Sequence, residues 1–127
     1  MPIIDTWKLV VLERYAKFDG RAGRPEYWWF ALANFLAWMV LSILAVAAMA
    51  FADVLGILMF LVLGAYWVGL IVPTIAVAIR RLHDSNKSGW LLLIALIPFG
   101  SIVVLVFMLL ASDTGANQFG EAAEPLA

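Results

Sequence analysis

Two short segments of this 127-residue chain hold most of the side chains that could do chemistry. They read FDGRAGRPEYWWF, from Phe18 to Phe30, and RRLHDSNKSGW, from Arg80 to Trp90. Guanidinium groups bind carboxylates or phosphates through paired hydrogen bonds, so arginines beside acids suit an internal network or an anion site. The candidate anion or partner cluster consists of Arg21, Arg24, Glu26, Arg80, Arg81, His83, Asp84 and Lys87.

Three interpretations of this cluster stand at this point. The arginines tie the two segments together, or they bind an anionic lipid headgroup or a partner's acidic surface, or they belong to an enzyme acting on lipid headgroups. The single histidine, His83, has no second histidine or carboxylate pair at ligand spacing, and no nucleophile is marked out. We therefore predict no catalytic residue, no metal site, no cofactor and no nucleic-acid partner.

The elements that position these residues are predicted from three runs without a charge, at 27–52, 54–79 and 90–112. Each run exceeds the roughly 20 residues that a helix needs to cross a bilayer. The hydrophobic fraction is 65% and the mean hydropathy +1.00, well above soluble domains at about 45–50% apolar residues. The predicted fold class is therefore an all-α integral membrane protein with three transmembrane helices.

The distribution of cations predicts the orientation. With three spans, the N-terminal segment 1–26 and the loop 80–89 lie on one side, together with all eight Lys and Arg residues. The positive-inside rule places that side in the cytoplasm and the polar C-terminal tail, 113–127, on the far side. We take the asymmetry to support a count of three spans.

A short helix is predicted before the first span. Ile4, Trp7, Val11, Tyr15 and Phe18 recur at helical spacing. Such an apolar stripe is typical of a helix lying in the membrane interface. The alternative is a helix packed on the transmembrane bundle.

A polar and proline layer is predicted inside the membrane, formed by Asn34, Pro73 and Pro98. Proline has no N–H group, so Pro73 and Pro98 free the carbonyls of Gly69 and Ile94. Asn34 is placed to donate to one of these carbonyls. We expect this layer to join the three helices.

The predicted partners follow from the membrane class. They are the lipid bilayer, an anionic phospholipid, and a second copy of the chain or another membrane protein. We favour a non-enzymatic protein whose cytoplasmic arginine-rich cluster binds lipid headgroups or a protein partner. A small channel or transporter subunit acting as an oligomer is the alternative, although ion-coupled transport normally needs ionisable residues inside the spans, and these runs have none.

The chain resembles the family of small bacterial inner-membrane proteins called domain of unknown function 805, from about Tyr15 to Gly120. The resemblance implies a multi-pass protein of the bacterial inner membrane, and no activity. Where many members have glycine after Ser85 this chain has Asn86, which also tolerates a left-handed turn. The tail GANQFG can form a specific turn. The matching residues are Phe18, Gly20, Arg21, Arg24, Glu26, Tyr27, Trp28 and Phe30, then Arg80, Arg81, Leu82, His83, Asp84, Ser88, Gly89 and Trp90, then Pro98, Gly100 and the tail motif.

Overall fold

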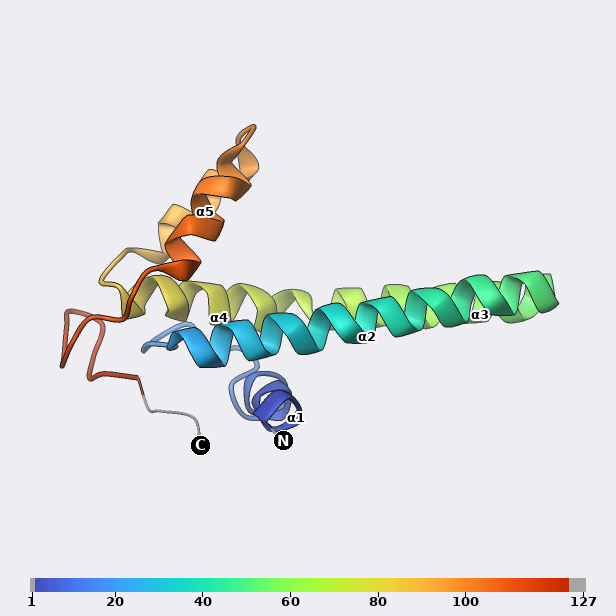
Figure 1. The fold of residues 1–127 in the computed structure, drawn as a ribbon, viewed down its shortest axis with the longest axis horizontal. Coiled ribbons are helices and arrows are strands. Elements are labelled where there is room, and N and C mark those ends of the chain that lie inside the picture. Colours follow the sequence, from blue (N-terminus) through green and yellow to red (C-terminus); the bar gives the residue numbers. More distant parts are fainter. Residues whose placement is uncertain (1, 124–127) are drawn as a thin grey trace.

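The protein is built around two long apolar helical paths that run side by side in opposite directions (Figure 1). This computed structural model describes residues 2–123. Helix α2 spans Arg24–Phe51, and the return path is α3, Asp53–Gly69, followed directly by α4, Ile71–Asp84. Both paths are long and apolar enough to cross a membrane. They correspond to the first two predicted spans, and we call them the helix pair.

The turn between α2 and α3 is tight because only Ala52, in an extended conformation, separates the two helices. Asp53 opens α3, where its negative charge suits the positive helix N-terminus. A Cβ atom on Gly56 would lie 2.6 Å from the Cα atom of Met49. Glycine at this position therefore lets the two helices approach closely just after the turn.

A break separates α3 from α4 at Leu70, three residues before Pro73. As predicted, Pro73 leaves the Gly69 carbonyl without a helical donor. The donor that replaces it is the Tyr15 hydroxyl, 2.7 Å away. The prediction that Asn34 donates to a freed carbonyl is therefore wrong for the Gly69 carbonyl.

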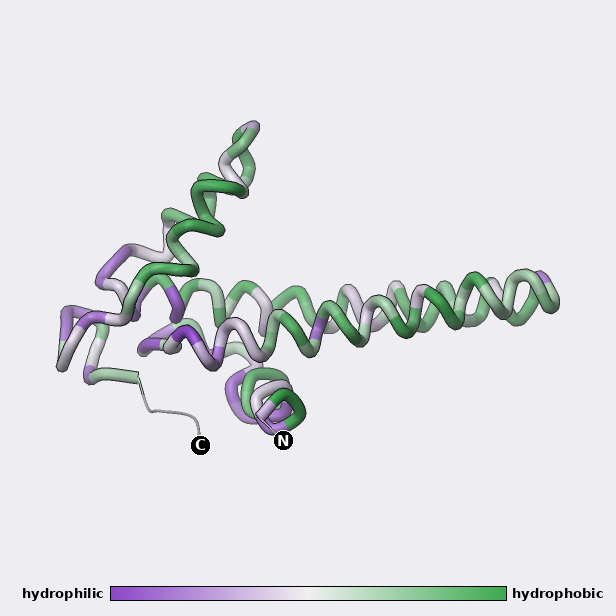
Figure 2. Tube along the Cα trace, in the orientation of Figure 1, coloured by the Kyte–Doolittle hydropathy of each residue, from purple (hydrophilic) through white to green (hydrophobic). Residues whose placement is uncertain are grey.

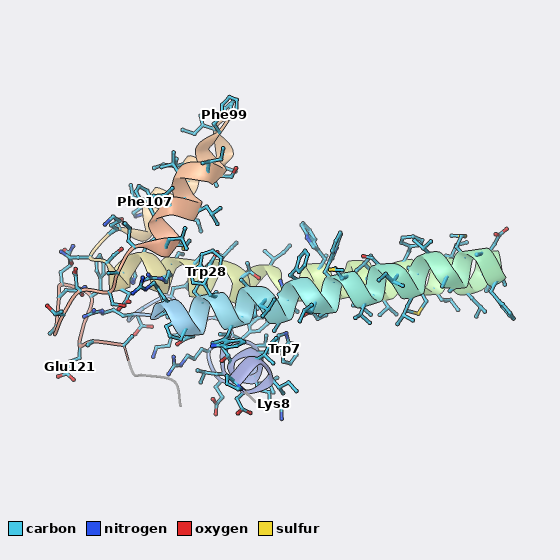
Figure 3. All side chains as sticks on the ribbon, viewed as in Figure 1. Trp7, Lys8, Trp28, Phe99, Phe107 and Glu121 are labelled. Atoms are coloured by element: carbon cyan, nitrogen blue, oxygen red, sulfur yellow. The ribbon has the colours of Figure 1, made fainter. Side chains whose placement is uncertain are left out.

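Asn34 instead joins α2 to the return path through a tyrosine. Its Oδ1 atom accepts a hydrogen bond of 2.9 Å from the Tyr66 hydroxyl, which in turn accepts one of 3.1 Å from Trp7 Nε1. The predicted polar layer thus links the N-terminal helix, α2 and α3. Pro98 takes no part in it, because it lies next to Phe99 at the far tip of another element (Figure 3).

The N-terminal segment is helical, as predicted, with α1 at Pro2–Lys8 continuing as a π-helical turn, η1, at Leu9–Glu13. Figure 1 views α1 end on, so this helix runs across α2. Its inner face buries Thr6 and Val10 against the helix pair, whereas Ile4 of the predicted stripe is 52% exposed. The helix is packed on the bundle, and its outer face mixes apolar and charged side chains.

The third predicted span, 90–112, is not confirmed, because this run does not form one helix and folds back on itself. A 3₁₀ helix, η2, covers Gly89–Leu96 and α5 covers Gly100–Leu109, with the chain reversing between them. Phe99 adopts a left-handed conformation with φ of 65°, and a Cβ atom on Gly100 would lie 1.6 Å from the Ile94 carbonyl oxygen. We call residues 89–109 the apolar hairpin.

The C-terminal tail consequently returns to the end of the molecule that holds the N-terminal segment and the 80–89 loop. The Asp113 amide donates a 2.8 Å hydrogen bond to the Asp84 carbonyl. The structure does not support the expectation that the tail lies on the opposite side, because this contact holds the tail beside the end of α4. The predicted tail turn is present, because Asn117 and Gly120 pair through their backbones, 2.8 Å from the Asn117 N–H to the Gly120 carbonyl.

Hydropathy follows this geometry (Figure 2). Hydrophilic residues gather where the N-terminal segment, the loop after α4 and the tail meet, whereas the helix pair and the apolar hairpin are mostly hydrophobic. We call the first region the polar end and define it as residues 14–26, 80–88 and 110–120. Asn86 has φ of 60° in its loop, in agreement with the tolerance expected of asparagine there.

Candidate functional site: an arginine and carboxylate cluster

The first half of the site is centred on Glu26, in the first turn of α2. Pro25 starts this helix, and the Glu26 carboxylate favours the positive helix N-terminus. Arg80 Nη1 donates to Glu26 Oε2, and Arg14 Nη1 donates to Oε1 at 2.5 Å. Arg80 Nε also donates to the Lys17 carbonyl at 3.0 Å. One buried carboxylate thus joins α2, α4 and the segment after η1.

The second half of the site is centred on Asp84, the last residue of α4, which is 0% exposed. Arg21 Nε donates to its Oδ1 atom at 3.0 Å. Arg81 Nη1, three residues away on the same helix, donates to Oδ2 at 3.2 Å. The Ser112 hydroxyl donates to the same Oδ2 atom. Asp84 therefore joins α4 to both the N-terminal segment and the tail.

The two arginines on Asp84 also hold the tail through backbone carbonyls. Arg21 Nη1 donates to the Gly115 carbonyl at 2.6 Å, and Nη2 donates to the Asp113 carbonyl at 2.7 Å. Arg81 Nε donates to the Met108 carbonyl at 3.0 Å, and Nη2 donates to the Leu110 carbonyl. Carbonyls in the last turn of a helix lack partners within that helix, so Arg81 caps α5.

His83 joins the same assembly through its ring. Its Nδ1 atom lies 2.9 Å from the Gly20 carbonyl, so this nitrogen carries the proton and donates. The ring stacks on Phe119 with centroids 4.0 Å apart and an interplanar angle of 3°. The His83 carbonyl accepts a 3.0 Å hydrogen bond from Asn117 Nδ2. This histidine therefore fastens the tail turn to the N-terminal segment.

Two of the predicted site residues stay outside the buried network. Arg24 is exposed, and within residues 2–123 it forms no hydrogen bond or ion pair. It lies near enough to Arg81 for their charges to repel. Lys87 Nζ donates to the Ser85 carbonyl at 3.3 Å and lies 5.9 Å from the centre of the Phe107 ring.

The ion pairs do not balance. In the described part of the chain, four guanidinium groups face two carboxylates, which leaves two positive charges without a paired acid. Arg80 and Arg81 are 0% exposed, and the buried Nη2 atom of Arg80 has no hydrogen-bond partner in the described part of the chain. Because burying an unpaired charge is costly, a positive surplus at this end favours anions nearby.

Sequence reasoning missed Arg14, Ser112 and the carbonyls of the tail. Arg14 had been counted only among the cations that set orientation, yet it shares Glu26 with Arg80. Ser112 ends an apolar run that we expected to finish across the membrane. One signal could have revealed both residues. Acids and arginines cluster strongly in two short segments, and such a cluster needs partners from a third segment of the chain.

The geometry of the site gives little support for a catalytic role. Within residues 2–123, no group of three His, Cys, Asp or Glu side chains comes together to hold a metal ion. The buried acids are each shared by two arginines, and the His83 ring is hydrogen-bonded and stacked. The arrangement acts as a clamp, since it closes three separate chain segments around two carboxylates.

Two helices long and apolar enough to cross a membrane, in an otherwise helical chain, fit a multi-pass membrane protein. The chain belongs to the family described as "Protein of unknown function (DUF805)", whose model matches residues 15–121. That match includes all eight residues of the candidate cluster, and it excludes Arg14 and α1. The family resemblance inferred from the sequence is thereby confirmed.

Two relatives from Escherichia coli (strain K12) are similar to nearly the whole chain. Inner membrane protein YhaH is 40% identical over 123 residues, which cover 90% of this chain and 93% of the relative. Inner membrane protein YhaI is 36% identical over 115 residues, which cover 90% and 92%. No solved structure matches. These relatives place the protein in the bacterial inner membrane.

Proposed function

We propose that the protein is a non-enzymatic inner-membrane protein whose polar end faces the cytoplasm and binds anionic phospholipid headgroups. The observation that carries the proposal is the surplus of positive charge at this end. Among residues 2–123, two of the four paired arginines lack an acid of their own, and the exposed Arg24 adds a third unpaired charge.

The arginines of the polar end have different roles: some hold the fold together, and Arg24 is available to a ligand. Arg21 and Arg81 are occupied by Asp84 and by backbone carbonyls, so they hold the fold. Arg24, at the start of α2, is exposed and forms no hydrogen bond or ion pair with any of residues 2–123. A phosphate beside Arg24 would meet a guanidinium fork and, next to it, the positive N-terminus of α2.

The orientation of the polar end is argued from the cations. All eight Lys and Arg residues lie in segments 8–24 and 80–87, and the α2–α3 turn contains none. The tail also contains none, so its return to the polar end leaves the asymmetry unchanged. The asymmetry therefore does not by itself support three spans over two. The positive-inside rule supports a cytoplasmic polar end with two spans equally well.

Lipid retention in mild detergent tests the proposal. The protein is mixed with phosphatidylglycerol, which is anionic, or with phosphatidylcholine, which carries no net charge, and bound lipid is counted by native mass spectrometry. The variant is Arg24→Gln, and the matched control is Lys8→Gln, which removes one exposed positive charge from α1. One basic residue near an anionic surface is worth about 1 kcal/mol, so Arg24→Gln should weaken phosphatidylglycerol binding about fivefold.

The outcome depends on the comparison between the two variants. We expect Lys8→Gln to retain phosphatidylglycerol as the wild type does and phosphatidylcholine to bind weakly to all three proteins. Equal retention of both lipids, or equal loss in both variants, would contradict a headgroup site at Arg24. In the first case, the surplus charge would have to serve the acidic surface of a protein partner.

A further inference from the structure

The apolar hairpin is too short to cross a bilayer. Its two arms contain 8 and 10 residues. A 3₁₀ helix rises about 2.0 Å per residue and an α-helix about 1.5 Å, so each arm reaches roughly 15 Å. The hydrocarbon core of a bilayer is about 30 Å thick. The hairpin therefore has the depth of one leaflet.

Both ends of the hairpin are held at the polar end. Its first arm follows the 85–88 loop directly, where the Ser88 hydroxyl accepts a hydrogen bond from the Trp90 amide at 3.3 Å. Its second arm ends where Arg81 binds the carbonyls of Met108 and Leu110. The chain thus enters and leaves the hairpin on the same side of the molecule.

The hairpin projects obliquely away from the helix pair at the polar end (Figure 1). In Figure 1, it rises obliquely from the polar end and leans toward the far turn of the helix pair. Its tip carries Phe99, which Figure 3 shows at the extreme end of the element. A tilt of the helix pair away from the hairpin would bring the hairpin closer to the membrane normal. Tilt is expected, because the 28 residues of α2 extend for about 42 Å and the hydrocarbon core is only about 30 Å thick.

The surface of the hairpin is apolar on the sides that protein does not cover. Leu96 is 84% exposed, Phe99 82% and Ile102 59%. No charged residue occurs between Trp90 and Ser112. Phe99 also holds a left-handed conformation that non-glycine residues seldom adopt. A large apolar side chain displayed on such a turn suits hydrocarbon and would be unfavourable in water.

We infer that the apolar hairpin is a re-entrant membrane element. It enters the leaflet that faces the polar end, reverses at Phe99 among the acyl chains of that leaflet, and returns to the same side. Only α2 and the α3–α4 path cross the membrane, so the N-terminal segment and the tail share one compartment. The occupant of the exposed hairpin surface is lipid hydrocarbon. This inference is independent of headgroup binding at Arg24.

Cysteine labelling tests the inference, because the full chain contains no cysteine. Three exposed positions receive one cysteine each, in separate variants. Ala52→Cys marks the α2–α3 turn, Leu96→Cys marks the hairpin near its tip, and Ala116→Cys marks the tail. Each variant is treated with a membrane-impermeant maleimide in right-side-out and in inverted inner-membrane vesicles. Reaction after denaturation in SDS gives the total thiol, and Ile97→Cys replaces Leu96→Cys if that variant does not accumulate.

The expected pattern is distinct for each position. Ala116→Cys should react only in inverted vesicles, Ala52→Cys only in right-side-out vesicles, and Leu96→Cys in neither until the bilayer is dissolved. Reaction of Ala116→Cys and Ala52→Cys in the same type of vesicle would show a third crossing and overturn the inference, whereas an exchange of the two patterns would overturn only the cytoplasmic orientation of the polar end. Reaction of Leu96→Cys in intact inverted vesicles would place the hairpin in water and overturn the inference as well.

A second copy of the chain is the remaining occupant, and the same variants detect it. If Leu96→Cys stays unreactive in mild detergent while the protein has the mass of a dimer, the hairpin is covered by protein and the lipid assignment fails. We expect instead a reactive thiol at this position in detergent, since lipid is exchangeable and a packed interface is not.

Discussion

Replacing Asp84 by asparagine should be among the most damaging conservative changes in this protein. The Asp84 carboxylate is 0% exposed and receives Arg21 at 3.0 Å and Arg81 at 3.2 Å. The side chains of both arginines are at most 1% exposed, so neither charge can turn to water without opening the polar end. An amide keeps one oxygen acceptor but turns an N–H group toward a guanidinium.

The magnitude follows from the burial of the pairs. Removing one partner of a buried ion pair costs about 3–5 kcal/mol, because the other charge stays buried without compensation. Asp84→Asn strands two arginines, so we expect a loss of at least about 3 kcal/mol. For a chain of this size that corresponds to a fall in Tm of roughly 10 °C or more. The tail should also loosen, since Ser112 donates to the same carboxylate.

Thermal unfolding in mild detergent is the assay, with limited proteolysis of the tail as a second readout. Asp113→Asn is the matched control, since its carboxylate is half-buried and accepts a 3.1 Å hydrogen bond from Asn117, with no ion pair within the described residues. We expect the control to shift Tm by only a few degrees. Equal Tm values for Asp84→Asn and Asp113→Asn would refute the claim that the clamp stabilises the fold.

Two further substitutions test the hairpin turn and the polar layer. Gly100→Ala would place a Cβ atom 1.6 Å from the Ile94 carbonyl oxygen, so we expect a loss of more than about 2 kcal/mol or failure to accumulate, whereas Gly64→Ala, with nothing within 4 Å, should be tolerated in the same expression and melting assays. Asn34→Leu removes the acceptor of the Tyr66 hydroxyl and should lower stability by about 1 kcal/mol; an unchanged melting curve in detergent would show that this bond adds nothing.

Much of the site could be predicted from the order of residues alone. Arginines and acids near the ends of two apolar runs must meet if those runs pair as antiparallel helices, and Glu26 at the start of α2 does meet Arg80 near the end of α4 in this way. The pairing partners could not be predicted, because each guanidinium fork suits either carboxylate equally well. Arg14 was missed for the same reason, since its partner depends on how η1 turns back toward α2.

The sequence by itself determined the membrane class, two helical runs long enough to cross a bilayer, and the gathering of all the cations in segments outside those runs. Long charge-free runs must satisfy their backbone groups internally in lipid, and this requirement depends on local composition only. The same requirement is met by one straight helix or by two short helices in a hairpin. Local composition therefore cannot distinguish a third crossing from a re-entrant hairpin, even with Pro98 in the middle of the run.

Only the tertiary structure decided where the chain goes after Trp90. The reversal needs Phe99 in a left-handed conformation and the Gly100 backbone against the carbonyl of Ile94. The end of α5 and the tail are then held in place by contacts that span 27 to 94 positions of the sequence, from Arg81 to Met108 and from Arg21 to Gly115. Such contacts form when two distant segments reach the same end of the molecule, so the tail belongs to the clamp for a reason that no local pattern encodes.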